Sequence, residues 1–257
     1  MKLPRPSASL FFAVMLAVPL LARAQTPEVP DWAQPGSATH KQVPPPKDFH
    51  RATRTTEEAI GVFSGQSDIG GAVVKGSSRF DAKTGAYTID SAGYNIWYTR
   101  DEFRYLWKKV SGDVSLAADI RFPNPEGYFD RKVVFVIRQD LDDDSKEVMT
   151  ALHGGGLIHI ADRPEKGAEI KEAFRIEAPA SNKASPGMRL GIEKHGDEFT
   201  LFVGEPGQLL KQKGPAVTLK FDQPFYVGIG FTSHLPATSD TVVVSNVILE
   251  NAPGKLK

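Results

Sequence analysis

The segment Val-Ser-Leu-Ala-Ala-Asp-Ile-Arg-Phe at residues 114–122 places an apolar side chain at every second position. Side chains of a β-strand point to opposite faces in turn, so this repeat predicts a strand with one buried face. Val-Val-Phe-Val-Ile at residues 133–137 follows as an unbroken apolar run, which is typical of a central strand covered on both faces. The two segments together indicate a β-sheet whose middle is deeply buried.

Strand patterns continue on both sides of these segments. Alternating residues at 188–192 and 199–203 flank His195-Gly196-Asp197, the signature of a β-hairpin with glycine in its turn. Further strands are predicted at residues 87–89, 148–152, 157–160, 217–221, 225–231 and 241–249. Helix formers occur at residues 55–60 and at residues 164–174, where Gly167 favours a long charged hairpin loop instead. Because short connections require antiparallel pairing, we predict an all-β fold, a two-sheet antiparallel jelly-roll sandwich.

The N-terminus is typical of a secretory signal peptide at residues 1–24. Lys2 and Arg5 supply positive charge, residues 10–21 are apolar, and Ala22-Arg23-Ala24 matches a cleavage site. The apolar stretch is shorter than the ~20 residues that span a bilayer, although an uncleaved anchor is the alternative. We therefore expect cleavage after Ala24, no transmembrane span in the mature chain, and a periplasmic or secreted location.

The rest of the chain divides into three parts. Residues 25–55 are a predicted Pro-rich tether, partly disordered, because proline disfavours regular packing. Residues 56–252 form the predicted β-sandwich domain, which is long enough for a substantial core. Residues 253–257 are expected to form a frayed polar tail.

The composition excludes several classes of function. The chain holds 31 Lys and Arg against 31 Asp and Glu, and signal cleavage leaves 28 basic and 31 acidic residues, a formal charge of −3. A nearly neutral chain has no excess of positive charge that would attract nucleic acid. The absence of cysteine from the sequence excludes disulfides, thiol catalysis and Cys-ligated zinc.

Aromatic side chains are concentrated at residues 94–107, which include two of the three Trp residues. Sugar rings stack on flat aromatic faces beside polar groups, so Trp97 is a candidate ligand platform, with the edge of the core as the alternative. Phe103, Tyr105 and Trp107 alternate along one predicted strand, and we expect them to be ordinary core.

Polar residues at strand ends supply the other candidates. Arg138 shares a predicted face with Val134 and Val136, so its charge needs either a carboxylate in a structural ion pair or a ligand. Gln139 follows on the opposite face, and His153 precedes three glycines that bring it towards His159. Arg138, Gln139 and His153 join Trp97 as candidate ligand-binding residues, with a structural role as the alternative for Arg138 and His153.

No cofactor motif is evident in the sequence. Asp140, Asp142, Asp143 and Asp144 resemble the start of a calcium loop, but Ser145 and Ala151 stand where that loop needs Gly and Glu. A hairpin turn is the better interpretation, and calcium bound elsewhere through loop carbonyls is left open. The chain also lacks a G-x-S-x-G elbow, an H-E-x-x-H motif and a P-loop, so no residue is assigned as catalytic.

Two parts of the sequence carry a family resemblance. Gly93-Tyr94-Asn95-Ile96-Trp97 with residues 112–116, and residues 189–197 with 225–234, are similar to concanavalin A-like (laminin-G-like) jelly-roll modules of bacterial exported proteins. The most similar type is the module found with TolB-like β-propellers. The resemblance covers residues 60–250, and it implies a binding face on the concave sheet near Trp97, Arg138, Gln139 and His153.

Three functions are compatible with these observations. The first is an exported, non-catalytic module that binds carbohydrate or associates with the envelope. The second is a carbohydrate-active hydrolase or lyase on the same scaffold, for which Asp101, Glu102 and His153 are the candidates. The third is a protein–protein interaction module, motivated by the tether. The expected partner is therefore a glycan or an envelope protein.

Overall fold

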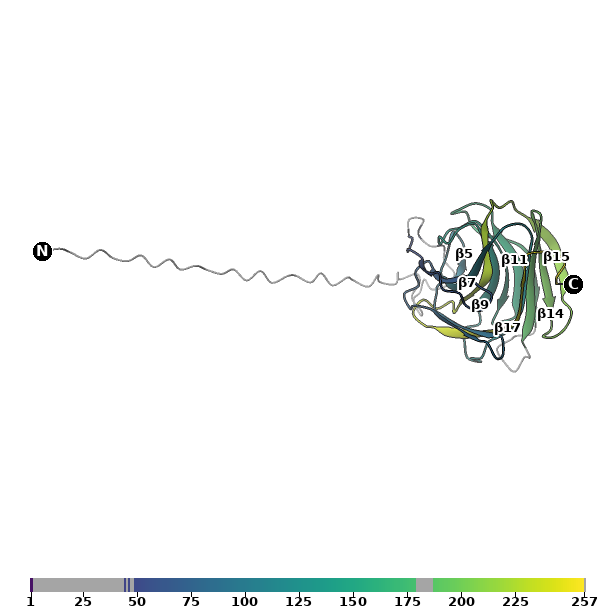
Figure 1. Cartoon of the computed structure of the whole chain (residues 1–257), viewed down its shortest axis with the longest axis horizontal. Coiled ribbons are helices and arrows are strands. Elements are labelled where there is room, and N and C mark those ends of the chain that lie inside the picture. Colours follow the sequence, from purple (N-terminus) through teal and green to yellow (C-terminus); the bar gives the residue numbers. More distant parts are fainter. Residues whose placement is uncertain (2–43, 45, 47–48, 179–186, 257) are drawn as a thin grey trace.

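A computed structural model describes residues 1, 44, 46, 49–178 and 187–256, and it is built of β-strands without a helix in that part of the chain (Figure 1). The predicted signal peptide, and the predicted tether up to residue 48 apart from positions 44 and 46, lie outside the described residues. The paired strands run antiparallel throughout, in two large sheets and one small one. The predicted two-sheet antiparallel jelly-roll sandwich is confirmed.

The larger sheet has eight strands. Their spatial order is β1 (Arg54–Thr56), β2 (Gly65–Ile69), β7 (Phe103–Val110), β16 (Phe225–Thr232), β9 (Lys132–Arg138), β10 (Glu147–His153), β11 (Leu157–Arg163) and β12 (Lys171–Glu177). The continuous apolar run at residues 133–137 lies in β9, four strands from one edge and three from the other. The prediction of a central strand at this position is therefore confirmed.

The second sheet has seven strands. Their order is β15 (Lys211–Thr218), β14 (Glu198–Gly204), β13 (Met188–His195), β8 (Val114–Arg121), β17 (Asp240–Glu250), β4 (Ala86–Ser91) and β3 (Ser77–Asp81). A third, two-stranded sheet pairs β5 (Ile96–Trp97) with β6 (Arg100–Asp101). The alternating segment at residues 114–122 thus lies in the centre of the seven-stranded sheet.

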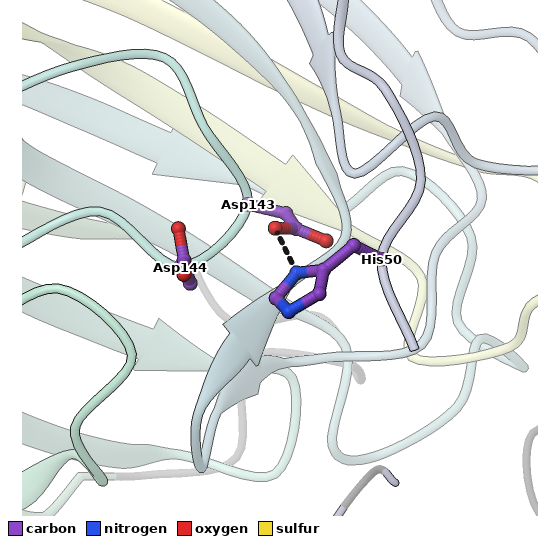
Figure 2. Close-up of side chains that lie close together, drawn as sticks. All are labelled: His50, Asp143 and Asp144. Atoms are coloured by element: carbon purple, nitrogen blue, oxygen red, sulfur yellow. Dashed lines mark hydrogen bonds and ion pairs between the residues drawn. The ribbon is translucent and has the colours of Figure 1, made fainter. Parts of the chain in front are cut away.

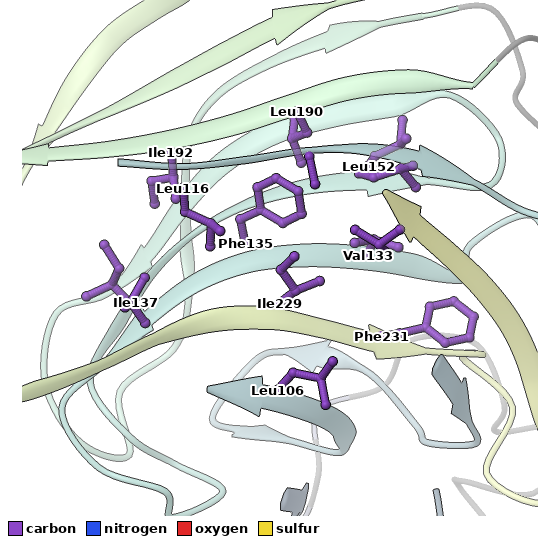
Figure 3. Close-up of a cluster of buried hydrophobic side chains, with 14 of the residues drawn as sticks. Leu106, Leu116, Val133, Phe135, Ile137, Leu152, Leu190, Ile192, Ile229 and Phe231 are labelled. Atoms are coloured by element: carbon purple, nitrogen blue, oxygen red, sulfur yellow. The ribbon is translucent and has the colours of Figure 1, made fainter. Parts of the chain in front are cut away.

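The main core fills the space between the two large sheets (Figure 3). Val133, Phe135 and Ile137 of β9 face Leu116 of β8 and Ile192 of β13 across this space, and all five are fully buried. Alternation along each strand explains the arrangement, because every second side chain points into the same layer. Burial of such side chains stabilises the fold by about 1.5–3 kcal/mol each relative to exposure.

A second core covers the opposite face of the eight-stranded sheet. Val134 and Val136 point to this side of β9, where they pack with Phe103, Tyr105 and Trp107 of β7. The expectation that these three aromatic residues are core is confirmed.

Gly230 lies under the second core, on β16. A Cβ at this position would lie 2.5 Å from the ring of Phe103, so the aromatic residue packs directly on bare backbone. A sheet with apolar packing on both faces explains why β9 carries no alternation.

Other predictions were wrong in part. Residues 55–60, interpreted as a helix, are not helical: Thr55 and Thr56 belong to edge strand β1, where Thr55 Oγ1 lies 2.9 Å from Ser67 Oγ, and residues 57–59 are irregular. Residues 164–170 of the charged stretch are a loop, as the loop interpretation expected, but residues 171–174 already belong to β12, which was not predicted. The strands β2 and β3 were also missed, because their sequences are mostly polar.

Both ends of the described chain pack on the sandwich. His50, Arg51 and Thr53 bond to residues of the domain, and β1 begins at Arg54, so part of the segment expected as tether belongs to the fold. Leu256, expected in a frayed tail, is buried against Phe202. The remaining domain boundaries stay a prediction.

Candidate functional site

A polar pocket opens at one end of the second core. Its volume is about 160 Å³. Its walls are formed by Asn95, Trp97, Asp130, Lys132, His153, Leu157, His159, Glu172 and Arg175. We call this cavity the Trp97 pocket. Because β9, β10, β11 and β12 are neighbours in the sheet, residues from four strands meet here with β5 folded over them.

A glycine turn positions the two histidines. His153 ends β10, and Gly156 has φ 99°, a left-handed conformation that favours glycine. The Gly156 N–H donates to the carbonyl of His153 at 3.0 Å, which closes the turn into β11. The hairpin then places His153 and His159 on the same face, and the predicted approach of the two residues is confirmed.

The two imidazoles face each other inside the pocket. His153 Nε2 lies 3.3 Å from His159 Nε2, and His153 Nδ1 lies 3.6 Å from a carboxylate oxygen of Asp130. Burial lowers the pKa of His153 to about 4 and the pKa of His159 well below its usual value, so both rings are neutral at pH 7.

Two neutral rings can share only one proton between their Nε2 atoms. One ring therefore donates from Nε2 and has a bare Nδ1, whereas the other accepts at Nε2 and carries its proton on Nδ1. Neither Nδ1 has a hydrogen bond among the described residues. The pair therefore presents one buried Nδ1 donor and one buried Nδ1 acceptor at neutral pH.

Lys132 contributes a buried ammonium to the pocket wall. The residue is 2% exposed, and its Nζ donates to the carbonyl of Ile96 at 2.9 Å. The Nζ also lies over the ring of Trp97, 5.3 Å from its centre. Removal from water lowers the pKa of Lys132 to about 8, against the opposing charges of nearby carboxylates such as Asp130.

Trp97 forms the exposed wall of the pocket. Its ring is half-buried and meets the ring of His159 edge to face at 5.3 Å. Glu172 and Arg175 lie on β12 at the rim and form an ion pair of 3.5 Å with each other. The pocket therefore combines one aromatic face, buried polar atoms and a charged rim.

His234 is a third buried histidine, near Lys132, Asp130 and His153. It follows β16, is 2% exposed, and has φ 63°. Its ring lies between those of Tyr94 and Tyr128, with centre distances of 6.3 and 5.6 Å. Neither ring nitrogen has a hydrogen bond among the described residues, and burial lowers the pKa of His234. A left-handed backbone at a residue other than glycine, combined with a buried side chain that lacks hydrogen bonds, is typical of functional regions.

Arg138 lies at the other end of β9, away from the Trp97 pocket. Its guanidinium is fully buried and pairs with Asp101 at 2.6 Å and with Glu147 on β10. Arg163 of β11 completes the group through Asp101 at 2.7 Å and Glu147 at 3.4 Å. We call these four residues the buried ion cluster. Arg138 therefore has the carboxylate partners that its strand position requires.

The carboxyl groups of the buried ion cluster differ in pKa. Burial raises the pKa of Glu147 to about 7. Burial also disfavours the charge on Asp101, but the guanidinium groups of Arg163 and Arg138 outweigh it and hold the pKa of that carboxyl below its usual value.

Gln139 and Glu102 also lie outside the pocket. The side-chain amide of Gln139 exchanges two hydrogen bonds with the backbone of Asp222, at 3.1 and 2.9 Å, and so joins two loops. Glu102 pairs with Arg51 and Arg100 at 3.3 and 3.4 Å. Of the residues proposed from the sequence, the structure brings together Trp97 and His153 but not Arg138, Gln139, Asp101 or Glu102.

A second group with metal-binding side chains lies near the first described residues. The ligand atoms of His50, Asp143 and Asp144 lie within 4.8 Å of one another, and His50 points at Asp143 (Figure 2). Asp143 already bonds His50 Nδ1 at 2.8 Å and Arg100 Nε at 3.2 Å. Arg100 supplies a positive charge beside Asp143, as a metal ion would, so the group is explained as an ion-paired contact.

Sequence reasoning missed three residues of the pocket region. Lys132 and Asp130 were not among the predicted site residues, and His234 entered only as the last residue of the segment 225–234. The glycine run after His153 was the usable signal for the histidine pair. No signal in the sequence predicts the burial of Lys132, because that depends on β5 folding over the sheet.

Comparisons with known proteins bear on the fold. No family model matches the sequence, and no curated protein matches it. A functionally unknown protein from Saccharomyces cerevisiae has a similar structure, with a TM-score of 0.55 and 11% identity over 69% of this chain and 93% of that chain. Xylan beta-1,4-xylosidase from Bacillus halodurans C-125 matches with a TM-score of 0.51 and 12% identity, over 79% of this chain but 40% of that enzyme.

A third structure is the carbohydrate binding module CBM66 from Bacillus subtilis, with a TM-score of 0.45 and 15% identity over 68% of this chain and 92% of that chain. The yeast protein and the xylosidase, with TM-scores of 0.55 and 0.51, show a shared fold and nothing more at identities of 11% and 12%. The association with TolB-like β-propellers stays a prediction. Among the described residues, no helix has the length and apolar character needed to cross a membrane.

Proposed function

We propose that this chain is a carbohydrate-binding β-sandwich whose binding site is the Trp97 pocket. The observation that carries the proposal is the half-buried ring of Trp97 beside the buried polar groups of Lys132, His153 and His159. A sugar ring has an apolar C–H face and a rim of hydroxyl groups, so it needs an aromatic surface and hydrogen-bonding atoms together.

The comparison with the xylosidase supports a saccharide as the class of ligand, since that enzyme by its name acts on xylan and shares this fold over part of its length. For the location we propose the periplasm or the cell exterior. That proposal rests on the predicted signal peptide at residues 1–24, with predicted cleavage after Ala24.

The test is binding of a panel of mono- and oligosaccharides by the mature protein and by Trp97→Ala, measured by calorimetry. We expect a sugar that binds the wild type to lose at least about tenfold in affinity, or ~1.4 kcal/mol, because the stacking surface is removed. Phe80→Ala is the matched control, because Phe80 is an exposed aromatic residue on β3 of the other sheet. Unchanged affinity in a folded Trp97→Ala protein would reject this site.

A hydrolase or lyase is the second candidate, and the histidine pair favours it. Neutral His153 and His159 with Asp130 behind them form a chain of groups able to accept and pass a proton. The same oligosaccharide panel separates the two functions, because an enzyme releases shortened products and a binding module returns the saccharide unchanged.

A further inference from the structure

The ammonium of Lys132 lies in the pocket without a carboxylate at ion-pairing distance among the described residues. An ammonium has three N–H donors, and the described residues supply one acceptor, the carbonyl of Ile96. The contact with the ring of Trp97 stabilises the charge only in part. A buried charge is normally paired with an opposite charge that also forms hydrogen bonds to it. We therefore expect a further acceptor for the remaining N–H donors of Lys132.

The neighbouring charges do not provide that partner. Glu172, at the rim, is paired with Arg175, and Asp130 is close to His153. His153 and His159 are neutral at pH 7 because burial lowers their pKa values. Burial outweighs the attraction of Asp130 in setting the pKa of Lys132, which indicates that the charge is incompletely compensated.

We propose that the Trp97 pocket selects a sugar that carries a carboxylate, a uronic acid, with the carboxylate against Lys132 Nζ and the sugar ring against Trp97. Because Nζ lies 5.3 Å from the centre of the Trp97 ring, one sugar unit meets both groups. A carboxylate accepts hydrogen bonds without donating any, which matches the donors that Lys132 leaves open. This inference rests on the proposed function and adds the class of sugar.

The test compares glucuronate with glucuronamide, a neutral compound of nearly the same shape, by calorimetry at pH 7. We expect the wild type to bind glucuronate at least about tenfold more tightly, as an ion pair in a buried site allows. Lys132→Met, which keeps the length of the side chain and removes the charge, is expected to lose that preference and to bind glucuronate no more tightly than glucuronamide.

Lys109→Met is the matched control. Lys109 also lies over an aromatic ring, that of Tyr226 at 5.2 Å, but it is exposed and remote from the pocket. We expect this variant to keep the preference for glucuronate. Retention of the preference in Lys132→Met, or equal binding of glucuronate and glucuronamide by the wild type, would overturn the inference.

A pH series on the wild type provides a second test that needs no variant. Glucuronate stays ionised from pH 7 to 10, whereas Lys132, with its pKa of about 8, loses its charge. We expect the preference for glucuronate to fall about tenfold per pH unit above pH 8. The other titratable or charged groups around Lys132 are His153, His159, His234, Asp101, Glu147, Asp130, Glu172 and Arg175. Burial keeps the three histidines neutral above pH 7, and Glu147, with its pKa of about 7, gains its charge at the lower end of the series, before Lys132 loses its own. A constant preference up to pH 10 would contradict the role of Lys132.

The outcomes separate the two proposals. Binding of neutral sugars through Trp97 without a preference for glucuronate would overturn this inference and leave the proposed function standing. Absence of binding by every sugar would reject both. Binding of acetate alone with the affinity of glucuronate would show a carboxylate site without a sugar site, and would also reject both.

Discussion

Arg138 illustrates what a buried charge requires of its surroundings. The residue follows five apolar positions on β9, on the face of Val134 and Val136, and its side chain is fully buried. The structure meets this demand with Asp101 and Glu147, two carboxylates from separate elements, and with Arg163 as a second cation. The buried ion cluster therefore joins β6, β9, β10 and β11 through charge rather than through apolar contacts.

Substitution of Arg138 tests this arrangement. We expect Arg138→Leu to reduce the free energy of unfolding by about 3–5 kcal/mol, because Glu147 then lies buried with only the 3.4 Å contact to Arg163. Chemical denaturation at pH 7 measures the loss. Arg79→Leu is the control, since Arg79 is 72% exposed and its pair with Asp90 spans 3.8 Å; its effect is expected to stay below about 1 kcal/mol. A loss of similar size in both variants would contradict the account.

At the scale of elements, the strands of the main core were predictable and the edge strands were not. Alternation or an apolar run marked β8, β9, β13, β14, β16 and β17, because their side chains contact the opposite sheet. By contrast, β3 and β12 bury few residues, and their pairing follows from the strands beside them. The histidine pair of the site followed from a glycine turn within one hairpin. The rest of the Trp97 pocket required knowledge of how β5 and β12 lie in space.

Three carboxylates of the acidic loop between β9 and β10 surround Lys166. Lys166 Nζ lies 3.5 Å from Asp140 and 3.6 Å from Asp144, and it bonds Asp142 as well. Burial opposes its charge, but the bond to Asp142 and the neighbouring carboxylates raise the pKa of Lys166 to about 12. The lysine thus occupies the place that a cation would take among these carboxylates.

We therefore expect calcium and chelator to leave the melting temperature of the wild type unchanged. In Lys166→Gln the three carboxylates lose their counter-charge, and millimolar calcium is expected to stabilise the protein, by about 1.4 kcal/mol at a tenfold excess over Kd. Thermal unfolding with calcium and with chelator measures the effect. Lys83→Gln, a change at an exposed lysine elsewhere, serves as the control. If Lys166→Gln does not respond to calcium, the three carboxylates do not converge on one ion.

At the scale of the whole molecule, both ends of the described chain contribute to stability. The segment before β1 bonds the loop that follows β9, through Thr53 Oγ1 to the carbonyl of Leu141 at 2.7 Å. At the other end, the Gly254 N–H donates to Glu193 at 2.7 Å. These contacts extend the folded domain beyond the boundaries that were predicted from composition. Proline content and closeness to a terminus do not predict where a single apolar side chain packs.

Leu256 tests whether the C-terminal residues contribute to stability. The side chain is 4% exposed and packs with Ala117 and Phe202 on the outer face of the seven-stranded sheet. We expect Leu256→Ala to lower the free energy of unfolding by about 1.5–3 kcal/mol, the contribution of a buried leucine. Leu209→Ala makes the same chemical change at a side chain that is 78% exposed, and it is expected to stay within about 0.5 kcal/mol of the wild type. Parallel denaturation of the two variants measures the difference. Equal stabilities would mean that the last residues do not pack on the sheet in solution, and that the fold ends with β17.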